Sequence, residues 1–422
     1  KKVLLAAVQM RTTNNKLTNL RRTYDFIREI VAERDKRTDF IQDANNTTKH
    51  TPTVENSQSM DIFICLPECC AFMGANGDET ITAAESIDPN PESVLNFPHA
   101  KCKVNFRRDS ADQIESHKGD ITNFTKGYDG IGDINYTAGL CEMASQFKVW
   151  ISVGGFPEKR LEDATKISNT HFIISPEGKI ASSLYRKIHL FDAPVVGLCE
   201  SKSTVPGNEI VTASVANWNV ALTICYDIRF PELYQSMRFT GTGAVEAMHR
   251  PPPPPGPVIE AEAAATRILN PSTTTIATTT TTTTTSPSAS KYTEKESSPA
   301  ATAAVAPAPG GIDMILVPSA FACKTGAAHW EVLLRARAIE TQCYVVAAAQ
   351  SGKHNDKRTS YGHSMIIDPW GSIIAHLDDS QPGEGVCYAV ADKTDVLSIR
   401  QSMPIQDHKR PDLFKPRFRA AI

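Results

Sequence analysis

The sequence predicts a mixed α/β fold that contains antiparallel hairpins. Three observations carry this prediction: short apolar or β-branched runs recur along the chain, two stretches have helical spacing, and two turn sequences separate neighbouring runs. The runs that we expect to form strands are Val3–Val8, Ile62–Leu66, Val149–Val153, Phe172–Ile174, Val220–Ile224, Met314–Val317, Tyr344–Ala349, Ser364–Ile367 and Val386–Val390. These runs alone specify the fold class no further.

Two stretches repeat apolar residues every three or four positions, which is the spacing of one face of a helix. The first comprises Leu17, Leu20, Tyr24, Ile27 and Val31, and the second comprises Trp330, Leu333, Leu334 and Ala338 within Trp330–Thr341. Two other segments, Ser175–Gly178 and Asp368–Gly371, contain the proline and glycine that favour tight turns. We expect each of these turns to close a hairpin between the runs on either side of it.

Length and composition allow a sizeable core and argue against several classes of partner. The chain has 422 residues, of which 41% are hydrophobic, so it can form two or three average domains or one larger α/β domain. A net charge of −3 gives no electrostatic reason to expect binding to nucleic acid or to an anionic membrane surface. No apolar run approaches the length of a transmembrane helix, and no segment near the start resembles a signal peptide. We expect a cytoplasmic protein, or a mitochondrial one if a leader has been removed, because the chain opens at Lys1 without a methionine.

The ten cysteines are scattered along the chain and form no C-x-x-C pair, and several of them lie in strand-like runs. This usage is typical of free thiols in a reducing compartment and makes a poor zinc site. The eleven histidines contain no H-E-x-x-H spacing. We therefore expect no bound metal.

Three segments lack the pattern of a packed core. Residues 38–59 are polar and rich in Asn and Thr, residues 95–135 are charged and irregular, and residues 241–311 are of low complexity, with Pro251–Pro255 and eight threonines at Thr278–Thr285. Such segments bury too little apolar surface to offset their chain entropy, so we expect disordered insertions. A single domain over residues 1–422 is favoured over two domains, 1–241 and 312–422. Lengthening a loop from about five to about seventy residues costs only about 2 kcal/mol.

One cysteine stands where chemistry is often located. The run Val220–Ile224 ends at Cys225, and Pro231-Glu232, which favour the first turn of a helix, follow shortly after. A thiol at the carboxyl end of a buried strand, facing a helix N-terminus, is favoured as the thiolate. The alternative is a packed core cysteine, since free cysteines are often buried.

Three more charged residues occupy strand ends or the turns beside them. Glu68 follows the buried run that ends at Leu66, Lys187 follows the predicted strand Lys179–Leu184, and Glu200 lies in a turn after Cys199. Each alone is typical of a solvated charge. Together they fit amide hydrolysis, because one carboxylate can take the thiol proton and pass it to the leaving amine. The ammonium group can stabilise the oxyanion, and the second carboxylate can keep the lysine charged and oriented.

With this order of Glu68, Lys187 and Cys225, the chain resembles the nitrilase (carbon–nitrogen hydrolase) superfamily, which uses a Glu–Lys–Cys triad. The resemblance covers nearly everything outside the three insertions. It extends to the Nit branch of that superfamily. The segments that carry it are Ser319–Phe321, Thr325-Gly326, Ala328–Gln350, Ser360–Ser364 and Asp368–Gly371.

The resemblance implies an α-β-β-α sandwich of the nitrilase type that forms a homodimer and acts on a small-molecule amide without a cofactor. It implies that Glu68 is the general base, Lys187 the oxyanion stabiliser, Cys225 the nucleophile and Glu200 a supporting carboxylate. The backbone N–H of Tyr226 would complete the oxyanion hole.

The resemblance also implies a substrate pocket that contains Arg229, Phe321 and Thr325. A planar guanidinium such as that of Arg229 can hold an α-keto acid carboxylate with two hydrogen bonds. The alternative for this arginine is a structural salt bridge with Asp227 or Glu232. The longest insertion lies between Arg229 and Phe321, so we expect it to affect access to the pocket or the dimer face more than the chemistry.

Within the Nit branch, Ala336, Ile339–Thr341 and Lys357-Arg358 resemble the deaminated glutathione amidases more than the ω-amidases. This implies hydrolysis of deaminated glutathione to 2-oxoglutarate and cysteinylglycine through a cysteine thioester, which is a metabolite-repair reaction. The enzymatic alternatives are an ω-amidase acting on 2-oxoglutaramate, a nitrilase proper and an N-carbamoyl amidohydrolase. A non-catalytic scaffold with a Thr/Pro-rich interaction arm is the alternative from another class. The presence of all four catalytic residues argues against it.

Overall fold

The computed structural model describes residues 1–46, 60–87, 135–193, 198–239, 311–380 and 383–410, together with Leu413. All of these residues belong to one compact unit, which includes chain on both sides of the low-complexity segment. The disorder predicted for the insertions, and with it the single domain predicted for residues 1–422, lies outside the described residues.

The described residues form two six-stranded sheets. The first sheet has the order β16 (Gly385–Asp392), β1 (Lys2–Gln9), β2 (Asp61–Leu66), β3 (Trp150–Lys159), β4 (Ile167–Ile174) and β5 (Tyr185–Arg186). The second has the order β15 (Ile373–His376), β14 (Met365–Ile367), β11 (Tyr344–Ala347), β10 (Met314–Leu316), β9 (Trp218–Leu222) and β8 (Thr212–Val215). In each sheet the three central neighbours β1-β2-β3 and β11-β10-β9 are parallel, and the outer pairs are antiparallel.

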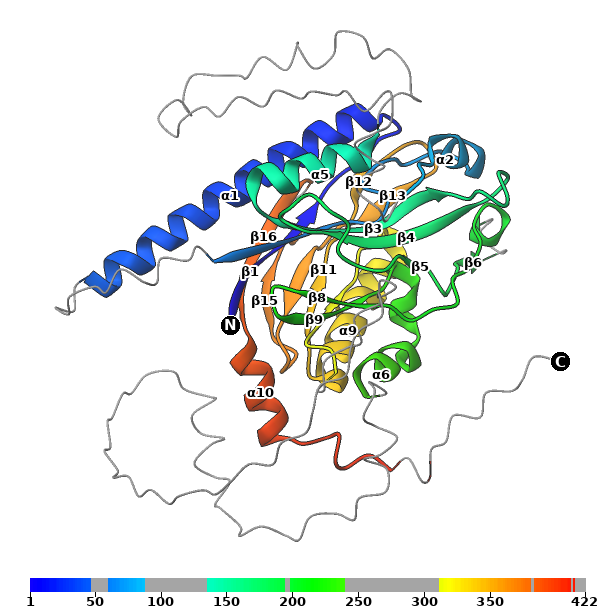
Figure 1. The fold of residues 1–422 in the computed structure, drawn as a ribbon. Coiled ribbons are helices and arrows are strands. Elements are labelled where there is room, and N and C mark those ends of the chain that lie inside the picture. The colour runs from blue at the N-terminus through cyan, green and yellow to red at the C-terminus, as the bar shows by residue number, and fades with distance from the viewer. Residues whose placement is uncertain are drawn as a thin grey trace, which may run out of the picture. The chain divides into compact units, whose positions relative to one another are not determined.

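The two sheets pack face to face, and helices cover their outer faces (Figure 1). The helices are α1 (Lys16–Asn46), α2 (Gly77–Ala83), α5 (Tyr136–Phe147), α6 (Pro231–Phe239), α9 (Cys323–Thr341) and α10 (Lys393–Ser402). Successive side chains of a strand point to opposite faces. Val3 and Leu5 of β1 accordingly pack between the sheets, whereas Leu4 packs with α1 and α5. The second sheet packs its outer face against α6 and α9. This arrangement confirms the predicted α-β-β-α sandwich.

The nine apolar runs predicted as strands all lie in or overlap strands, and both predicted hairpin turns are present. In the first turn Gly178 N–H donates to the Ser175 carbonyl, and in the second Gly371 N–H donates to the Asp368 carbonyl. The predicted strand Lys179–Leu184 is wrong, because within it only Ile180 forms a bridge and β5 begins at Tyr185. This segment contains two serines in succession, and the Ser182 hydroxyl accepts a hydrogen bond from the Ile173 N–H in place of a continuous ladder.

The insertion boundaries differ from those predicted. Helix α1 continues to Asn46, so the irregular structure expected from residue 38 is wrong for residues 38–46. Asn135, predicted to end the second insertion, is the N-cap of α5, and its side chain accepts a hydrogen bond from the Ala138 N–H. An asparagine at this position satisfies one of the free N–H groups of the first turn. Gly311, predicted to end the third insertion, is also described, and the rest of the three segments lies outside the described residues.

The third insertion leaves and rejoins the sandwich at neighbouring points. Its flanking residues are Phe239, which ends α6, and Gly311, which precedes β10. Gly311 has φ +73°, and a Cβ there would lie 2.3 Å from the carbonyl oxygen of Arg238. This close approach requires glycine. The Gly311 carbonyl also accepts a hydrogen bond from the Asn219 amide at 3.2 Å, so the rejoining point lies near the start of β9.

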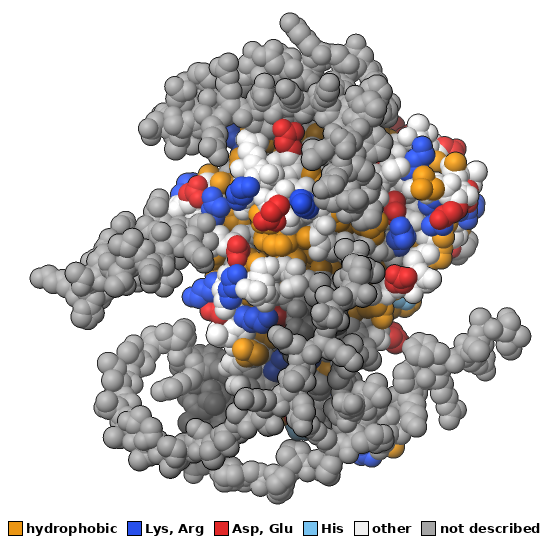
Figure 2. Space-filling model, viewed as in Figure 1, with side chains coloured by type: hydrophobic (Ala, Val, Ile, Leu, Met, Phe, Trp, Pro, Cys, Tyr) orange, Lys and Arg blue, Asp and Glu red, His pale blue; other side chains and the backbone are white. Residues whose placement is uncertain are grey.

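In the view of Figure 2, acidic and basic side chains of the described residues are intermixed. The described part of this face therefore shows no large patch of a single charge. None of the described helices combines the length and the apolar character that crossing a membrane requires.

A buried histidine joins the two sheets. His171 of β4 is fully buried, and its Nδ1 lies 2.9 Å from the carbonyl oxygen of Thr223, which follows β9. Its Nε2 lies 2.7 Å from the Ser152 hydroxyl of β3. A neutral ring satisfies both partners, because Nδ1–H donates to the carbonyl and Nε2 accepts from the hydroxyl. Burial lowers the pKa of His171 to about 4, although the Thr223 carbonyl and Asp227 act in the opposite direction.

We expect His171 to make the fold sensitive to mild acid. Its folded pKa of about 4 lies below its ordinary value of 6.5, so its contribution is present above pH 6.5 and is lost as the pH falls towards 4. This group should lower the free energy of unfolding by about 2 kcal/mol between pH 7 and pH 5. Urea unfolding at the two pH values measures the effect. The variant His171→Asn should show that much less pH dependence than the wild type, and equal dependence would contradict the prediction.

Candidate active site

Cys225 lies in a strained turn directly after the central strand β9. It begins a short 3-10 helix, Cys225–Arg229, and has φ 47°, which is a left-handed conformation that residues other than glycine rarely adopt. Its N–H donates to the Pro318 carbonyl at 2.9 Å, which ties the turn to the loop after β10. Strained backbone of this kind persists only where its surroundings hold it, and it is frequent at functional sites.

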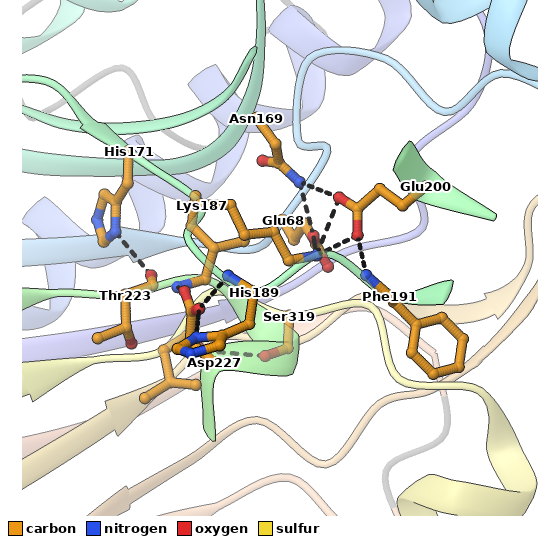
Figure 3. Close-up of polar contacts among 12 residues, drawn as sticks. Glu68, Asn169, His171, Lys187, His189, Phe191, Glu200, Thr223, Asp227 and Ser319 are labelled. Atoms are coloured by element: carbon orange, nitrogen blue, oxygen red, sulfur yellow. Dashed lines mark hydrogen bonds and ion pairs between the residues drawn. The ribbon is translucent and has the colours of Figure 1, made fainter. Parts of the chain in front are cut away.

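Asp227 holds this turn in place. Its fully buried carboxylate accepts hydrogen bonds from the Ile224 N–H at 2.9 Å and the Tyr185 hydroxyl at 2.7 Å. The other carboxylate oxygen accepts from the His189 N–H at 3.1 Å and from His189 Nδ1 at 2.8 Å (Figure 3). Tyr185 and His189 flank Lys187 in the sequence. Asp227 therefore connects the segment that carries Lys187 to the turn that carries Cys225.

The predicted catalytic charges converge on one buried cluster (Figure 3). The Nζ atom of Lys187 lies 3.3 Å from Oε1 of Glu68 and 2.9 Å from Oε2 of Glu200. Asn169 of β4 donates from its amide to both carboxylates, at 3.1 Å each. The Phe191 N–H donates to Glu200 at 2.7 Å. The structure thus brings together three of the residues that the sequence singled out, from the loop after β2, the segment after β5 and the turn after β7 (Leu198–Cys199).

A glycine allows Glu68 to reach this position. Gly155 of β3 has φ +73°, and a Cβ there would lie 2.3 Å from Cγ of Glu68. The Gly155 carbonyl also accepts a hydrogen bond from the Cys69 N–H at 3.0 Å. A larger residue would push the general-base candidate away from the lysine.

Lys187 carries its charge in this cluster. Burial alone lowers the pKa of an ammonium group, but the charges of Glu200 and Glu68 outweigh it and hold the pKa of Lys187 well above its usual range. A buried cation is tolerated when it is paired and hydrogen-bonded, as here. The lysine is therefore available as a fixed positive charge beside the nucleophile.

The surroundings of Cys225 favour its thiol form. Burial raises the pKa of its thiol well above the usual range, the charge of Glu68 raises it further, and Lys187 opposes both. This contradicts the expectation that a helix N-terminus would favour the thiolate. Desolvation disfavours the charged form of a buried thiol, and the charge of Glu68 acts in the same direction. The thiol must therefore lose its proton as it attacks, and Glu68 lies beside it to accept that proton.

Arg229 lies in an aromatic setting. Its guanidinium is 5.7 Å from the ring centre of Tyr226 and 5.6 Å from that of Phe321, and its Nη2 donates to Nδ1 of His329 at 3.2 Å. Stacking on aromatic faces is a usual setting for arginine. The alternative salt bridge with Asp227 or Glu232 is wrong for the described residues, because Asp227 is committed to Tyr185 and His189 and no ion pair joins Arg229 to Glu232.

Thr325 is used differently from Phe321. Its hydroxyl donates to the Ala322 carbonyl at 3.2 Å in the first turn of α9. Its predicted contact with substrate stays a prediction, as do the catalytic roles of Glu68, Lys187, Cys225, Glu200 and the Tyr226 N–H. The sequence did not identify Asn169, His189 or His329 as members of the site. Within the described ranges, no group of three or more His, Cys, Asp or Glu side chains is placed to hold a metal ion.

Comparison with known proteins identifies the family. The model of the carbon–nitrogen hydrolase family matches residues 4–252 and 301–401, which is well over half of the chain. The chain belongs to the carbon–nitrogen hydrolase family. This carbon–nitrogen hydrolase is 30% identical over 412 residues to a Dictyostelium discoideum protein named deaminated glutathione amidase, with 96% of this chain and 94% of the relative covered.

Two further relatives agree with the family and the fold. The human protein named deaminated glutathione amidase is 34% identical over 279 residues, which cover 65% of this chain and 63% of the human protein, less than two thirds of its length. The crystal structure of the Caenorhabditis elegans NitFhit protein superimposes with a TM-score of 0.60 and 26% identity, covering 98% of this chain and 66% of that one. These matches confirm the predicted resemblance to the Nit branch of the nitrilase superfamily.

We expect Asp227→Asn to damage both the fold and catalysis in this hydrolase. An amide cannot accept all four hydrogen bonds, so buried donors lose their partner at a cost of about 1–3 kcal/mol in the free energy of unfolding. Displacement of the cysteine and lysine segments should lower amide hydrolysis by about 10- to 100-fold. Urea unfolding and an amidase assay measure the two effects. The exposed Glu232→Gln serves as control, and an Asp227 variant that behaves like it would contradict the assigned role.

Proposed function

We propose that this nitrilase-family amidase hydrolyses deaminated glutathione to 2-oxoglutarate and cysteinylglycine. The observation that carries the proposal is the convergence of Glu68 and Lys187 on the thiol of Cys225 in one desolvated site. The name deaminated glutathione amidase, given to the Dictyostelium and human relatives, supports the choice of substrate. The human match covers only 63% of that protein, so the site must also account for the choice of substrate.

The reaction begins with attack of the Cys225 sulfur on the amide carbonyl. The thiol proton passes to Glu68 as the carbon–sulfur bond forms. The developing oxyanion is stabilised by the charge of Lys187 and by the Tyr226 backbone N–H. Glu68 then gives the proton to the leaving nitrogen, the carbon–nitrogen bond breaks, and a thioester to Cys225 remains.

Water completes the cycle. Glu68, again a carboxylate, takes a proton from the water molecule that attacks the thioester, and the carbon–sulfur bond breaks as the acid is released. The proton held by Glu68 returns to the sulfur, which restores the thiol. Throughout the cycle Glu200 keeps Lys187 charged and oriented, and Asn169 holds both carboxylates at fixed positions.

Arg229 supplies recognition of the acyl part of the substrate. Since no carboxylate of the described residues pairs with it, its guanidinium is available to the carboxylate of an α-keto acid. The aromatic rings of Tyr226 and Phe321 limit its movement, which lowers the entropy lost on binding. This cation is positioned on the same turn as the nucleophile, two residues past Asp227.

Deaminated glutathione and 2-oxoglutaramate are the substrates that test the proposal. The purified protein should release cysteinylglycine from the first, and a trapped intermediate should show a mass increase of one 2-oxoglutaryl group on Cys225. Cys225→Ala should lose both signals, and Cys323→Ala, which removes an exposed thiol, should keep both. Brisk turnover of 2-oxoglutaramate alone would replace the proposal with an ω-amidase. Turnover of nitriles or N-carbamoyl amides alone would point to those branches, and no turnover of any substrate would favour a scaffold.

The protein is also proposed to act as a homodimer that pairs through α9. This helix exposes Val332 and Ile339, at 68% and 49% of their surface, and Trp370 beside Gly371 is 49% exposed. A Cβ on Gly371 would lie 2.5 Å from Ile339, so these apolar side chains share one surface. An exposed apolar patch of this kind favours association.

We expect light scattering to give about twice the chain mass of 46.0 kDa. Val332→Asp should convert the dimer to a monomer because it buries a charge in the proposed contact. Leu161→Asp is the matched control, since Leu161 is 90% exposed in the turn between β3 and β4, outside this surface. A wild-type monomer, or a dimer that persists in Val332→Asp, would contradict the proposed pairing.

A further inference from the structure

A hairpin outside the triad is attached to the loop that carries Glu68. The hairpin pairs β12 (Ser351–Lys353) with β13 (Thr359–Tyr361). Gln350, immediately before it, donates from its side-chain amide to the backbone carbonyl of Glu68 at 2.9 Å and to the Thr12 hydroxyl at 2.6 Å. The base of the hairpin is therefore fixed to the backbone of the general-base candidate itself.

The tip of the hairpin is fixed as well. His354 lies 2.9 Å through Nδ1 from the Thr12 carbonyl and 2.9 Å through Nε2 from the Ser360 hydroxyl. A neutral ring satisfies both contacts, with Nδ1–H donating and Nε2 accepting. Burial lowers the pKa of His354, and the nearby charges of Arg358 and Arg11 lower it further. The backbone N–H of His354 also donates to the Arg358 carbonyl, so the fixed tip positions the backbone of Arg358.

Arg358 lies over the loop that follows β2. Its Nη1 is 3.0 Å from the sulfur of Met73, and its charge also acts on the thiol of Cys69, the neighbour of Glu68. The hairpin carries two further cations: Lys353, which pairs with Asp356 at 2.9 Å, and Lys357, which precedes Arg358 in the sequence. The contact with Met73 places the Arg358 guanidinium beside the loop that also carries Glu68. None of the described ion pairs involves Arg358, so it has no carboxylate partner among these residues.

The proposed reaction indicates which part of the substrate lies near Arg358. Glu68 must reach the leaving nitrogen in order to protonate it, so the leaving group extends on the side of the Glu68 loop. The acyl carboxylate is bound separately by Arg229, on the turn of the nucleophile. A leaving dipeptide carries its own carboxylate, and two extended residues span about 7 Å. Such a tail can reach beyond Glu68 to the hairpin.

We propose that Arg358 binds the carboxylate of the leaving group and thereby selects amides whose departing amine carries an anionic tail. This rests on the proposed function and adds a second anion site to it. The planar guanidinium can hold a carboxylate with two parallel hydrogen bonds. An amide that releases ammonia has no group to place there and gains nothing from Arg358.

Two substrates that differ only in the tail test this directly. They are deaminated glutathione and its C-terminal carboxamide, with 2-oxoglutaramate as the substrate without a tail. The wild type should prefer the free carboxylate by about 10- to 100-fold in kcat/KM, mainly through KM. Arg358→Ala should abolish that preference and leave 2-oxoglutaramate turnover unchanged, and Arg358→Lys should retain part of it. Lys353→Ala, which removes a paired cation from the same hairpin, should behave like the wild type.

The outcomes separate this inference from the proposed function. A wild type that hydrolyses both tailed substrates equally, or an Arg358→Ala variant that keeps the preference, would overturn the role of Arg358 alone. An equal loss on all three substrates in Arg358→Ala would show a general structural effect and would also overturn it. A wild type inactive on deaminated glutathione would overturn the proposed function, and the inference with it.

Discussion

The site depends on one buried ammonium group. Removing a charge from water costs several kcal/mol unless nearby groups replace the lost solvation. For Lys187 those groups are Glu68 and Glu200, which lie far apart in the sequence and are themselves joined by Asn169. Because both carboxylates help to keep the lysine charged, Glu68 and Glu200 cannot move independently of it. The geometry required for catalysis is thus also the geometry that makes the buried charge tolerable.

A further buried carboxylate, that of Asp227, connects the segment that carries Lys187 to the turn that carries the sulfur. Asp227 accepts hydrogen bonds from Tyr185 and His189, which lie on either side of Lys187 in the sequence. It also accepts one from the Ile224 N–H, directly before Cys225. The strained φ of Cys225 persists because this turn is held from both sheets, through Asp227 on one side and Pro318 on the other. Since burial and the charge of Glu68 raise the pKa of the thiol, the proposed reaction requires Glu68 to accept the proton of Cys225 during the attack.

Local signals in the sequence predicted a mixed α/β fold and the positions of most strands, whereas the sandwich and the catalytic triad were implied by the resemblance to the nitrilase superfamily. Buried strands in the centre of both sheets are continuous apolar runs, and Glu68 and Cys225 directly follow such runs. The strand before Lys187 was misplaced because β5 has only two residues and no apolar pattern. Asn169, His189 and Asp227 were not recognised because their roles are set by partners far along the chain. The protonation state of Cys225 was missed for the same reason: it depends on burial and on Glu68, and neither can be read from a turn.

The residues that flank the third insertion, Phe239 and Gly311, lie at the opposite end of the strands of the second sheet from Cys225. β9 and β10 are parallel, Cys225 follows the carboxyl end of β9, and Gly311 precedes the amino end of β10. The chain before the insertion and the chain after it are in close contact there, at Arg238 and Gly311. Chain added at this place shifts neither sulfur nor lysine. The points where this segment joins the sandwich therefore lie a full strand length away from the turn that carries the sulfur.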